Sequence, residues 1–232
     1  MTPAIRLLVH GASGRMGSAL LRLAPELGLE TVAAVARRPL ADGCDALPPA
    51  RMDEAPAFDV AIDFSLPEAF DAVLALCVAR GVPLVSGTTG LSEAQRAAVR
   101  SAASRIPVVW AANFSLGVAV LADLVERAAQ LLDGWDCDIV EAHHVHKKDA
   151  PSGTALALGE RALAGGAQPR YASLRAGDIV GEHTVQFATA GERVELVHRA
   201  TNRDIFARGA LHVARRVVGR PPGLYAVKDL LT

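Results

Sequence analysis

Short apolar runs alternate with amphipathic stretches along the first half of the chain. The runs have the length of buried strands, and the stretches between them repeat apolar residues at the three- and four-residue spacing of helices that cover a core. The expected strands are residues 5–10, 31–36, 58–64, 82–86 and 107–112, and the expected helices are residues 15–27, 67–80 and 92–104. This order predicts a parallel sheet with helices on both faces.

The pattern changes after a long amphipathic stretch at residues 115–132. The elements expected beyond it are strands at residues 137–142, 184–190 and 193–199, and a helix at residues 154–164. The last two strands are joined across Ala190-Gly191-Glu192, which is typical of a hairpin turn. A second, sheet-rich domain is therefore expected. Periodicity alone leaves open whether the final stretches, residues 204–218 and 224–231, return to the first domain.

A glycine-rich turn follows the first expected strand. Gly11, Gly14 and Gly17 are spaced by three residues at the start of an expected helix. Glycines allow a tight turn and the close approach of a phosphate, and the helix N-terminus offers free N–H groups and a partial positive charge. The spacing also occurs in plain strand-to-helix turns. Its place in the first βαβ unit favours a dinucleotide phosphate as ligand.

Two further loops follow later expected strands, namely Gly87-Thr88-Thr89-Gly90 and Ala111-Ala112-Asn113-Phe114. Open parallel sheets bind their ligands beyond the carboxyl ends of the strands. Small residues let a ribose or a flat ring approach, Thr and Asn supply hydrogen bonds, and Phe114 is expected to pack on a nicotinamide. Each loop alone is more often an ordinary connection. Together with the glycine loop, they predict one crevice.

Residues 141–154, EAHHVHKKDAPSGT, concentrate three of the seven histidines beside two lysines. His143 can donate a proton, because imidazole titrates near neutral pH. Lys147 can offer a positive charge to a carboxylate. Ser152, Gly153 and Thr154 resemble an anion site made of N–H groups and hydroxyls at a helix start. This segment predicts the binding of a carboxylate beside a proton donor.

Simpler interpretations of these residues stay open. Ser152 is equally explained as a helix cap, and Lys148 as a solvated surface charge. Alternation along an extended segment separates His143 from the other two histidines, and the lysines repel a cation, so no metal site is expected. The remaining histidines are expected to be structural, namely His10, His183, His198 and His212.

Composition narrows the classes of function. The formal charge is −1 and both signs are dispersed, so no basic surface indicates a nucleic acid or an anionic membrane as partner. No apolar run approaches the ~20 residues that span a bilayer, and the first residues lack a signal-peptide pattern. Cys44, Cys77 and Cys137 lack zinc or redox spacing and are expected to be reduced bystanders. A cytoplasmic protein is expected.

Most of the chain resembles the dihydrodipicolinate reductase family. The family-like segments are VHGASGRMG, AIDFSLPEA, SGTTGL, AANFSLGV, EAHHVHKKDAPSGTAL, GDIVGEHTVQF, GERVELVHRATNRDIFARGAL and GLYAVKDLL. The histidine-containing segment is the most specific of them. The resemblance implies an α/β protein with a Rossmann-type parallel-sheet dinucleotide domain, residues 1–113 and 204–232. A smaller α+β domain, residues 114–203, would bind the substrate and assemble a homotetramer through its sheet.

The resemblance also implies a reaction and the residues that carry it. A hydride from NADPH or NADH goes to the unsaturated carbon conjugated with the ring C=N of a cyclic dicarboxylate, on the diaminopimelate route to lysine. His143 would protonate the resulting enamine, and Lys147 would be the second catalytic residue. Substrate carboxylates would be bound by His144, Ser152, Gly153 and Thr154. The cofactor would be bound by Gly11, Ala12, Ser13, Gly14, Arg15, Met16, Gly87, Thr88, Thr89, Ala111, Ala112, Asn113 and Phe114.

The chain departs from the family pattern in two places. The segment before Gly181 is much shorter than usual and is reduced to GAQPRYASLRAGD, which affects the edge of the substrate domain and the tetramer contacts. Where many dual-specificity members have an acidic residue followed by arginine, this chain has Ala36 followed by Arg37. The ribose 2′-hydroxyl thereby loses an acceptor, while Arg37, helped by Arg38, can bind a 2′-phosphate. NADPH is therefore the expected cofactor, with NADH as an alternative.

Two other functions suit the same organisation. A related nicotinamide dehydrogenase, such as an aspartate dehydrogenase, would oxidise an amino acid. A dinucleotide sensor would bind cofactor without catalysis. The pair His143 and Lys147 argues against the sensor, because a sensor needs no proton donor.

Overall fold

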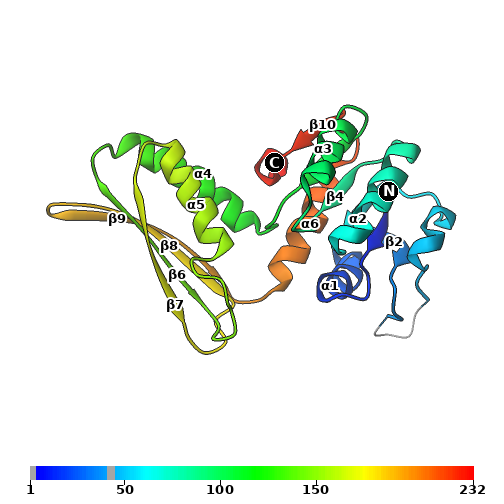
Figure 1. The fold of residues 1–232 in the computed structure, drawn as a ribbon, viewed down its shortest axis with the longest axis horizontal. Coiled ribbons are helices and arrows are strands. Elements are labelled where there is room, and N and C mark those ends of the chain that lie inside the picture. The colour runs from blue at the N-terminus through cyan, green and yellow to red at the C-terminus, as the bar shows by residue number, and fades with distance from the viewer. Residues whose placement is uncertain (1–3, 41–44) are drawn as a thin grey trace. The chain divides into compact units, whose positions relative to one another are not determined.

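The computed structural model describes residues 4–40 and 45–232, and Cys44 lies outside this part. The chain forms two compact units (Figure 1). The first runs to Phe114 and resumes at Phe206, and the second is Ser115–Ile205. No helix in the described part of the chain is both long enough and apolar enough to cross a membrane.

The first unit is built on a six-stranded parallel sheet. Its strands are β1 (Ile5–His10), β2 (Leu29–Val35), β3 (Val60–Asp63), β4 (Leu84–Ser86), β5 (Pro107–Trp110) and β10 (Gly223–Tyr225). Their spatial order is β10-β5-β4-β3-β1-β2, and each neighbouring pair is parallel. The strand order reverses between β1 and β3, which is where an open parallel sheet places its ligand. The glycine loop follows β1 at this point.

Helices cover this sheet and hold the loops at its edge. They are α1 (Arg15–Leu23), α2 (Pro67–Arg80), α3 (Glu93–Ala102) and α6 (Asp204–Val217), with the 3₁₀ turns η1 (Pro25–Leu27), η2 (Pro49–Glu54) and η3 (Val227–Leu230). The apolar stripe of α2 buries Phe70, Val73 and Cys77 in the core. Ser92 begins α3 with a capping box to Gln95, which satisfies N–H groups of the first turn.

The second unit is a mixed four-stranded sheet with two helices on one face. The strands are β6 (Asp136–His143), β7 (Pro169–Arg175), β8 (Gly181–Thr189) and β9 (Glu192–Ala200), in the order β7-β6-β8-β9. The helices α4 (Leu116–Leu131) and α5 (Gly153–Ala164) lie side by side against it (Figure 1). Val125, Leu158, Ile139 and Phe187 form part of the core between these layers. The expected α/β fold class is confirmed.

One expected helix needs correction, and two segments form elements that the sequence did not indicate. The helix expected at residues 15–27 ends at Leu23, because Pro25 has no N–H group to continue the helical hydrogen bonds, and a 3₁₀ turn follows. Residues 224–231, to which the sequence assigned no element type, include the end of the short β10 and the turn η3. Strand β7 was not expected. Its five central residues are all exposed, so it shows no alternation of apolar and polar positions.

Candidate active site

The glycine loop is packed too closely against neighbouring backbone to admit side chains. Gly11 has φ of +80°, and a Cβ there would lie 2.5 Å from the carbonyl oxygen of Phe64. A Cβ at Gly17 would overlap the backbone of Gly11 and Ala12. The amides of Gly11 and Ala12 donate to the carbonyl of Val35, at 3.0 and 3.1 Å. The loop therefore needs glycine at these positions and is held between β2 and β3.

The first turn of α1 suits an anion. Gly14 is its N-cap residue and provides no side-chain cap, whereas Ser92, Ser115 and Ser152 cap their own helices. Amide groups at such an end carry a partial positive charge and can bind a phosphate. The expected residue Ala12 is fully buried, while Arg15 is exposed and Met16 is partly buried.

A pocket of about 230 Å³ joins the glycine loop to the end of β2. Its lining includes Gly11, Ser13 and Gly14 from the loop, and Arg37 and Arg38, which are both exposed. A tight glycine turn, an uncapped helix start and two guanidinium groups together fit the phosphates of a dinucleotide. We refer to this region as the cofactor crevice.

A buried carboxylate connects the strand ends below the cofactor crevice. Asp63 accepts hydrogen bonds from His10 Nδ1 at 2.9 Å, Ser86 Oγ at 2.7 Å, Thr88 Oγ1 at 2.8 Å and the amide of Ser65 at 3.1 Å. Burial by itself would raise the pKa of Asp63, but these hydrogen bonds outweigh it and the pKa is lowered. This Asp63 cluster ties β1, β3 and β4 to the loop that carries Thr88.

The Asp63 cluster changes the interpretation of the second loop. The Thr88 side chain is buried and bonded to Asp63, so its hydroxyl is engaged inside the protein, whereas Thr89 is exposed. The Thr88 carbonyl accepts a hydrogen bond from Trp110 Nε1 at 2.9 Å. A Cβ at Gly87 would overlap the Phe64 ring. The loop is therefore positioned by its buried threonine.

The third loop supports the crevice differently from the expectation. Phe114 is 1% exposed, and its ring meets Phe64 edge to face with centroids 5.6 Å apart. We expected this ring to pack on a nicotinamide, but it is part of the core. Ala112 is exposed, and Ala111 and Asn113 are partly buried, which leaves this part of the loop for ligand contact.

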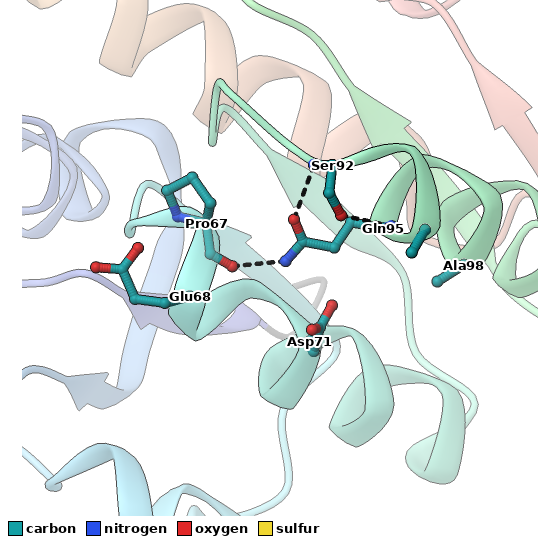
Figure 2. Close-up of a pocket in the computed structure, with 7 residues that line it drawn as sticks. Pro67, Glu68, Asp71, Ser92, Gln95 and Ala98 are labelled. Carbon is teal, nitrogen blue, oxygen red and sulfur yellow. Dashed lines mark hydrogen bonds between the residues drawn. The ribbon is translucent and has the colours of Figure 1, made fainter.

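A second pocket of the first unit, of about 590 Å³, lies between α2 and α3 (Figure 2). Gln95 bridges its two sides by donating to the carbonyl of Pro67 at 2.7 Å. Glu68 and Asp71 give the lining a negative character. None of the residues expected to bind the cofactor lines this pocket, and its charge disfavours a phosphate.

In the second unit, a buried ion-pair network surrounds the expected proton donor. Glu141 and His143 lie two residues apart on β6 and face the same side of the sheet. His143 Nδ1 is 2.5 Å from Glu141 Oε2. Arg175 from β7 binds the same carboxylate with both terminal nitrogens, at 2.8 and 3.0 Å, and the amide of Ser152 donates to Oε1 at 3.2 Å.

This network determines the charge of Glu141. Burial alone would raise its pKa, but hydrogen bonds from Arg175, Ser173 and His143 lower the pKa to about 2. Glu141 is therefore a carboxylate at neutral pH. Neither Glu141 nor Arg175 was among the residues expected from sequence. Glu141 begins the histidine segment, but Arg175 lies in a strand that carries no periodic signal.

His183 from β8 completes the network. It is 4% exposed, and its ring meets His143 edge to face with centroids 5.2 Å apart. Its Nε2 is hydrogen-bonded to Ser152 Oγ at 3.1 Å, and the same oxygen accepts from the amide of Ala155 to cap α5. Burial, assisted by the charge of His143, lowers the pKa of His183 to about 4. His183, which we expected to be structural, thus adjoins the candidate proton donor in a neutral form.

The other expected substrate-binding residues lie in the loop after β6 and at the start of α5. His144 Nε2 is 3.0 Å from Arg203 Nη2. Lys147 Nζ is 2.8 Å from one carboxylate oxygen of Asp149, and this carboxylate also accepts from the amide of Gly153. Lys147 and Gly153 therefore already bind a carboxylate that belongs to the chain itself.

Thr154 is partly buried in the first turn of α5, next to the exposed Gly153. Within residues 4–40 and 45–232, no three or more His, Cys, Asp or Glu side chains are grouped so that they could hold a metal ion.

Comparisons with known proteins cover the whole chain. Residues 5–114 match the family model "Dihydrodipicolinate reductase, N-terminus", and residues 117–231 match "Dihydrodipicolinate reductase, C-terminus". A 4-hydroxy-tetrahydrodipicolinate reductase of Xanthomonas axonopodis pv. citri is 68% identical over 235 residues, covering 99% of each chain. One from Xylella fastidiosa is 63% identical over 232 residues, covering 98% of each.

A solved structure has the same fold. A dipicolinate-bound dihydrodipicolinate reductase from Paenisporosarcina sp. TG-14 is 21% identical, with a TM-score of 0.82, over 98% of this chain and 100% of that one. The Xanthomonas and Xylella proteins are covered to 99% and 98% of their length, so they carry no long addition where the segment before Gly181 is short. The short segment is thus a feature shared with these relatives.

Proposed function

This chain belongs to the dihydrodipicolinate reductase family, and we propose that it reduces 4-hydroxy-tetrahydrodipicolinate, or the dihydrodipicolinate formed from it by loss of water, to tetrahydrodipicolinate. It is an NAD(P)H-dependent oxidoreductase of the diaminopimelate route to lysine. The 68% identity over 99% of both chains carries this conclusion.

The activity is tested with enzymatically generated substrate and a reduced nicotinamide cofactor. We expect a substrate-dependent loss of nicotinamide absorbance. Cofactor binding without that loss would instead indicate a dinucleotide sensor. Oxidation of aspartate, with no reduction of the cyclic dicarboxylate, would indicate an aspartate dehydrogenase.

We propose His143 as the proton donor. When bound, the reduced nicotinamide supplies a hydride to the ring carbon conjugated with the C=N bond, which leaves an enamine that requires one proton. Two features support His143 in this role. Its ring is held by Glu141, and its Nε2 lies 3.0 Å from where a Cβ at Gly181 would be, so glycine leaves space beside that nitrogen.

We propose that Lys147 and the start of α5 bind a substrate carboxylate, with His144 and Thr154 nearby. The support is chemical, because Lys147 and the Gly153 amide already bind the carboxylate of Asp149. A substrate carboxylate would replace Asp149 as their partner. The Ser152 hydroxyl is engaged by Ala155 and His183, so Ser152 would contribute by holding this helix start in place.

Replacing Lys147 with alanine is expected to raise the KM for the dicarboxylate and to lower kcat. Pyridine-2,6-dicarboxylate should inhibit the wild type competitively against substrate. It should bind about 10–100-fold more weakly to the variant, because this factor corresponds to the free energy of one charged hydrogen bond. Inhibition constants measured at fixed cofactor provide the check. Lys148→Ala, which removes the adjacent exposed lysine, is the control. Equal inhibition of wild type and Lys147→Ala would place the carboxylate site elsewhere.

We propose that NADPH is preferred over NADH. Ala36 offers no carboxylate at the end of β2, and Arg37 and Arg38 line the cofactor crevice beside the glycine loop. A guanidinium can bind a 2′-phosphate through two hydrogen bonds, and an alanine does not repel that phosphate.

Replacing Arg37 with alanine is expected to lower kcat/KM for NADPH by about 10–100-fold, because a charged hydrogen bond to the 2′-phosphate is lost. NADH lacks that phosphate and serves as the internal control, so its kcat/KM should change by less than about threefold. Both constants are measured at saturating dicarboxylate. A wild type that prefers NADH by about tenfold or more contradicts the assignment, as does an unchanged NADPH constant in the variant.

We propose a homotetramer assembled through the sheet of the second unit. The face of this sheet opposite α4 and α5 carries a row of small and apolar residues across all four strands, namely Ala172, Val140, Thr184 and Val197. Val197 is 40% exposed in the single chain, and the next row includes Leu174, which is 58% exposed. Such a face favours burial against another copy.

A reductase that draws on the reduced nicotinamide pool is proposed to act in the cytoplasm.

A further inference from the structure

We propose that Glu141 is a positioning residue for the proton donor, and that Arg175 of β7 holds Glu141 in that role. The inference rests on the proposed function of His143. It concerns two residues that contact neither cofactor nor dicarboxylate in this proposal and act through the imidazole ring.

The short contact between Glu141 and His143 determines which nitrogen of the ring can exchange a proton. A carboxylate has acceptor atoms only, so His143 must donate from Nδ1 to Glu141 Oε2, at 2.5 Å. The neutral ring then carries its hydrogen on Nδ1. Nε2, the nitrogen beside Gly181, remains the position that gains and loses a proton. Glu141 thereby directs the transferable proton toward the side of the ring that lies beside Gly181.

Arg175 keeps this carboxylate in place and charged. A buried carboxylate without partners becomes protonated, and it then loses its preference for a donor at Nδ1. Arg175 supplies two hydrogen bonds to Glu141, one to each oxygen. The same guanidinium donates to the carbonyl of Asp149 at 2.5 Å, in the loop that contains Lys147. Arg175 therefore links the orientation of the proton donor to the loop proposed to bind the substrate.

The groups that face His143 come from several elements and have different charges. Glu141 on β6 is negative, Arg175 on β7 is positive, and His183 on β8 is neutral above a pKa of about 4. Lys147 contributes a positive charge from the loop after β6. Glu141 is therefore the negative group that is hydrogen-bonded directly to the His143 ring.

A glutamine at position 141 would preserve the shape of the network and reverse its polarity. Its amide has one acceptor end and one donor end. Arg175 Nη2 and the Ser152 amide both donate to Oε1, so the oxygen keeps that position, and the NH₂ group takes the Oε2 position beside His143 Nδ1 and Arg175 Nη1. The neutral ring then places its hydrogen on Nε2, and an imidazolium would meet a donor at Nδ1. The acid form of His143 is disfavoured although the ring is present.

The test measures Glu141→Gln as a full-length, cofactor-saturated enzyme. We expect kcat to fall by about 10²-fold or more, with both KM values within about threefold of wild type, because the variant impairs proton donation and leaves binding intact. The solvent deuterium isotope effect on kcat should increase, since proton transfer becomes slower than the other steps. In nitrogen-15 spectra, the Nδ1–H signal of His143 is assigned by its absence from His143→Ala. We expect the same signal to be missing from Glu141→Gln.

A matched control separates positioning from a general loss of an ion pair. Glu126 pairs with Arg161 at 3.1 Å between α4 and α5, outside the network. Glu126→Gln should therefore keep wild-type kcat, isotope effect and imidazole spectra. If Glu141→Gln keeps more than about half of the wild-type kcat, or loses activity with unchanged spectra and isotope effect, the positioning role is wrong.

A second variant decides the question if Glu141→Gln does not fold. Arg175→Lys retains a positive charge but loses the two-nitrogen contact, and the Arg175 side chain is 18% exposed, so a fold is expected to persist. Its kcat should drop by about tenfold with an increased solvent isotope effect. An unchanged kcat in that variant overturns the role of Arg175. If His143→Ala retains activity, the proposed role of His143 as proton donor is wrong. If His143→Ala is inactive and Glu141→Gln is fully active, only the positioning role of Glu141 is wrong.

Discussion

Replacing His143 with alanine is expected to lower kcat by about 10²–10⁴-fold, which is the usual contribution of a well-placed general acid. The residue is 7% exposed and its ring is held by Glu141 and His183, so the ring is oriented before any ligand arrives. Alanine removes the proton source and leaves the first unit unaltered. Cofactor affinity should therefore change by less than about threefold.

The measurement is steady-state turnover under conditions where the chemical step limits the rate, verified by the primary isotope effect from deuterated cofactor. Cofactor affinity is followed separately by the quenching of protein fluorescence. His146→Ala is the matched control, because His146 is an exposed histidine of the same segment. A His143→Ala enzyme that retains more than about half of wild-type kcat would show that the proton comes from elsewhere.

Replacing Asp63 with alanine is expected to lower the free energy of unfolding by about 3–5 kcal/mol, because each buried donor left without an acceptor costs about 1–3 kcal/mol. Asp63 is fully buried and accepts from His10, Ser86 and Thr88. Alanine leaves these groups without their acceptor. The loop that carries Thr88 is also released, so the KM for the cofactor should rise.

Urea denaturation at neutral pH measures this loss, and Asp59→Ala is the control. Asp59 pairs with Arg6 at a partly exposed position, where an ion pair contributes only about 0–1 kcal/mol. Equal losses in the two variants would contradict a special role for the Asp63 cluster.

The stability that Asp63 contributes should depend on pH in a defined direction. The folded-state pKa is lowered from its ordinary value, so the contribution is present above the unfolded pKa of about 3.9 and is lost as the pH falls through the folded pKa. The difference between wild type and Asp63→Ala should therefore shrink in acid. A difference that instead grows as the pH falls would show that the carboxylate is not favoured in the folded chain.

Loops and strand ends could be located from the sequence, but the direction of their side chains could not. Thr88 and Phe114 belong to loops identified beforehand, yet the Thr88 hydroxyl is bonded to Asp63 and the Phe114 ring is packed on Phe64. Which side of an irregular loop faces the core depends on contacts with residues far away along the chain. No local periodicity encodes that choice, whereas glycine positions such as Gly11 and Gly17 follow from a local steric need.

By itself the sequence determined most of the strands and helices, the glycine loop, and the segment that contains His143 and Lys147, because these follow from short-range periodicity and local chemistry. The partners of His143 were decided by the tertiary structure alone. Strand pairing puts Glu141 opposite His183 on β8 and beside Ser173 on β7, which brings Arg175, 34 residues away, to the same carboxylate. The central positions of strand β7 are exposed, and the strand is held by main-chain pairing with β6 rather than by burial of an apolar pattern. Main-chain hydrogen bonds do not depend on side-chain type, so pairing of this kind cannot be predicted from a single sequence.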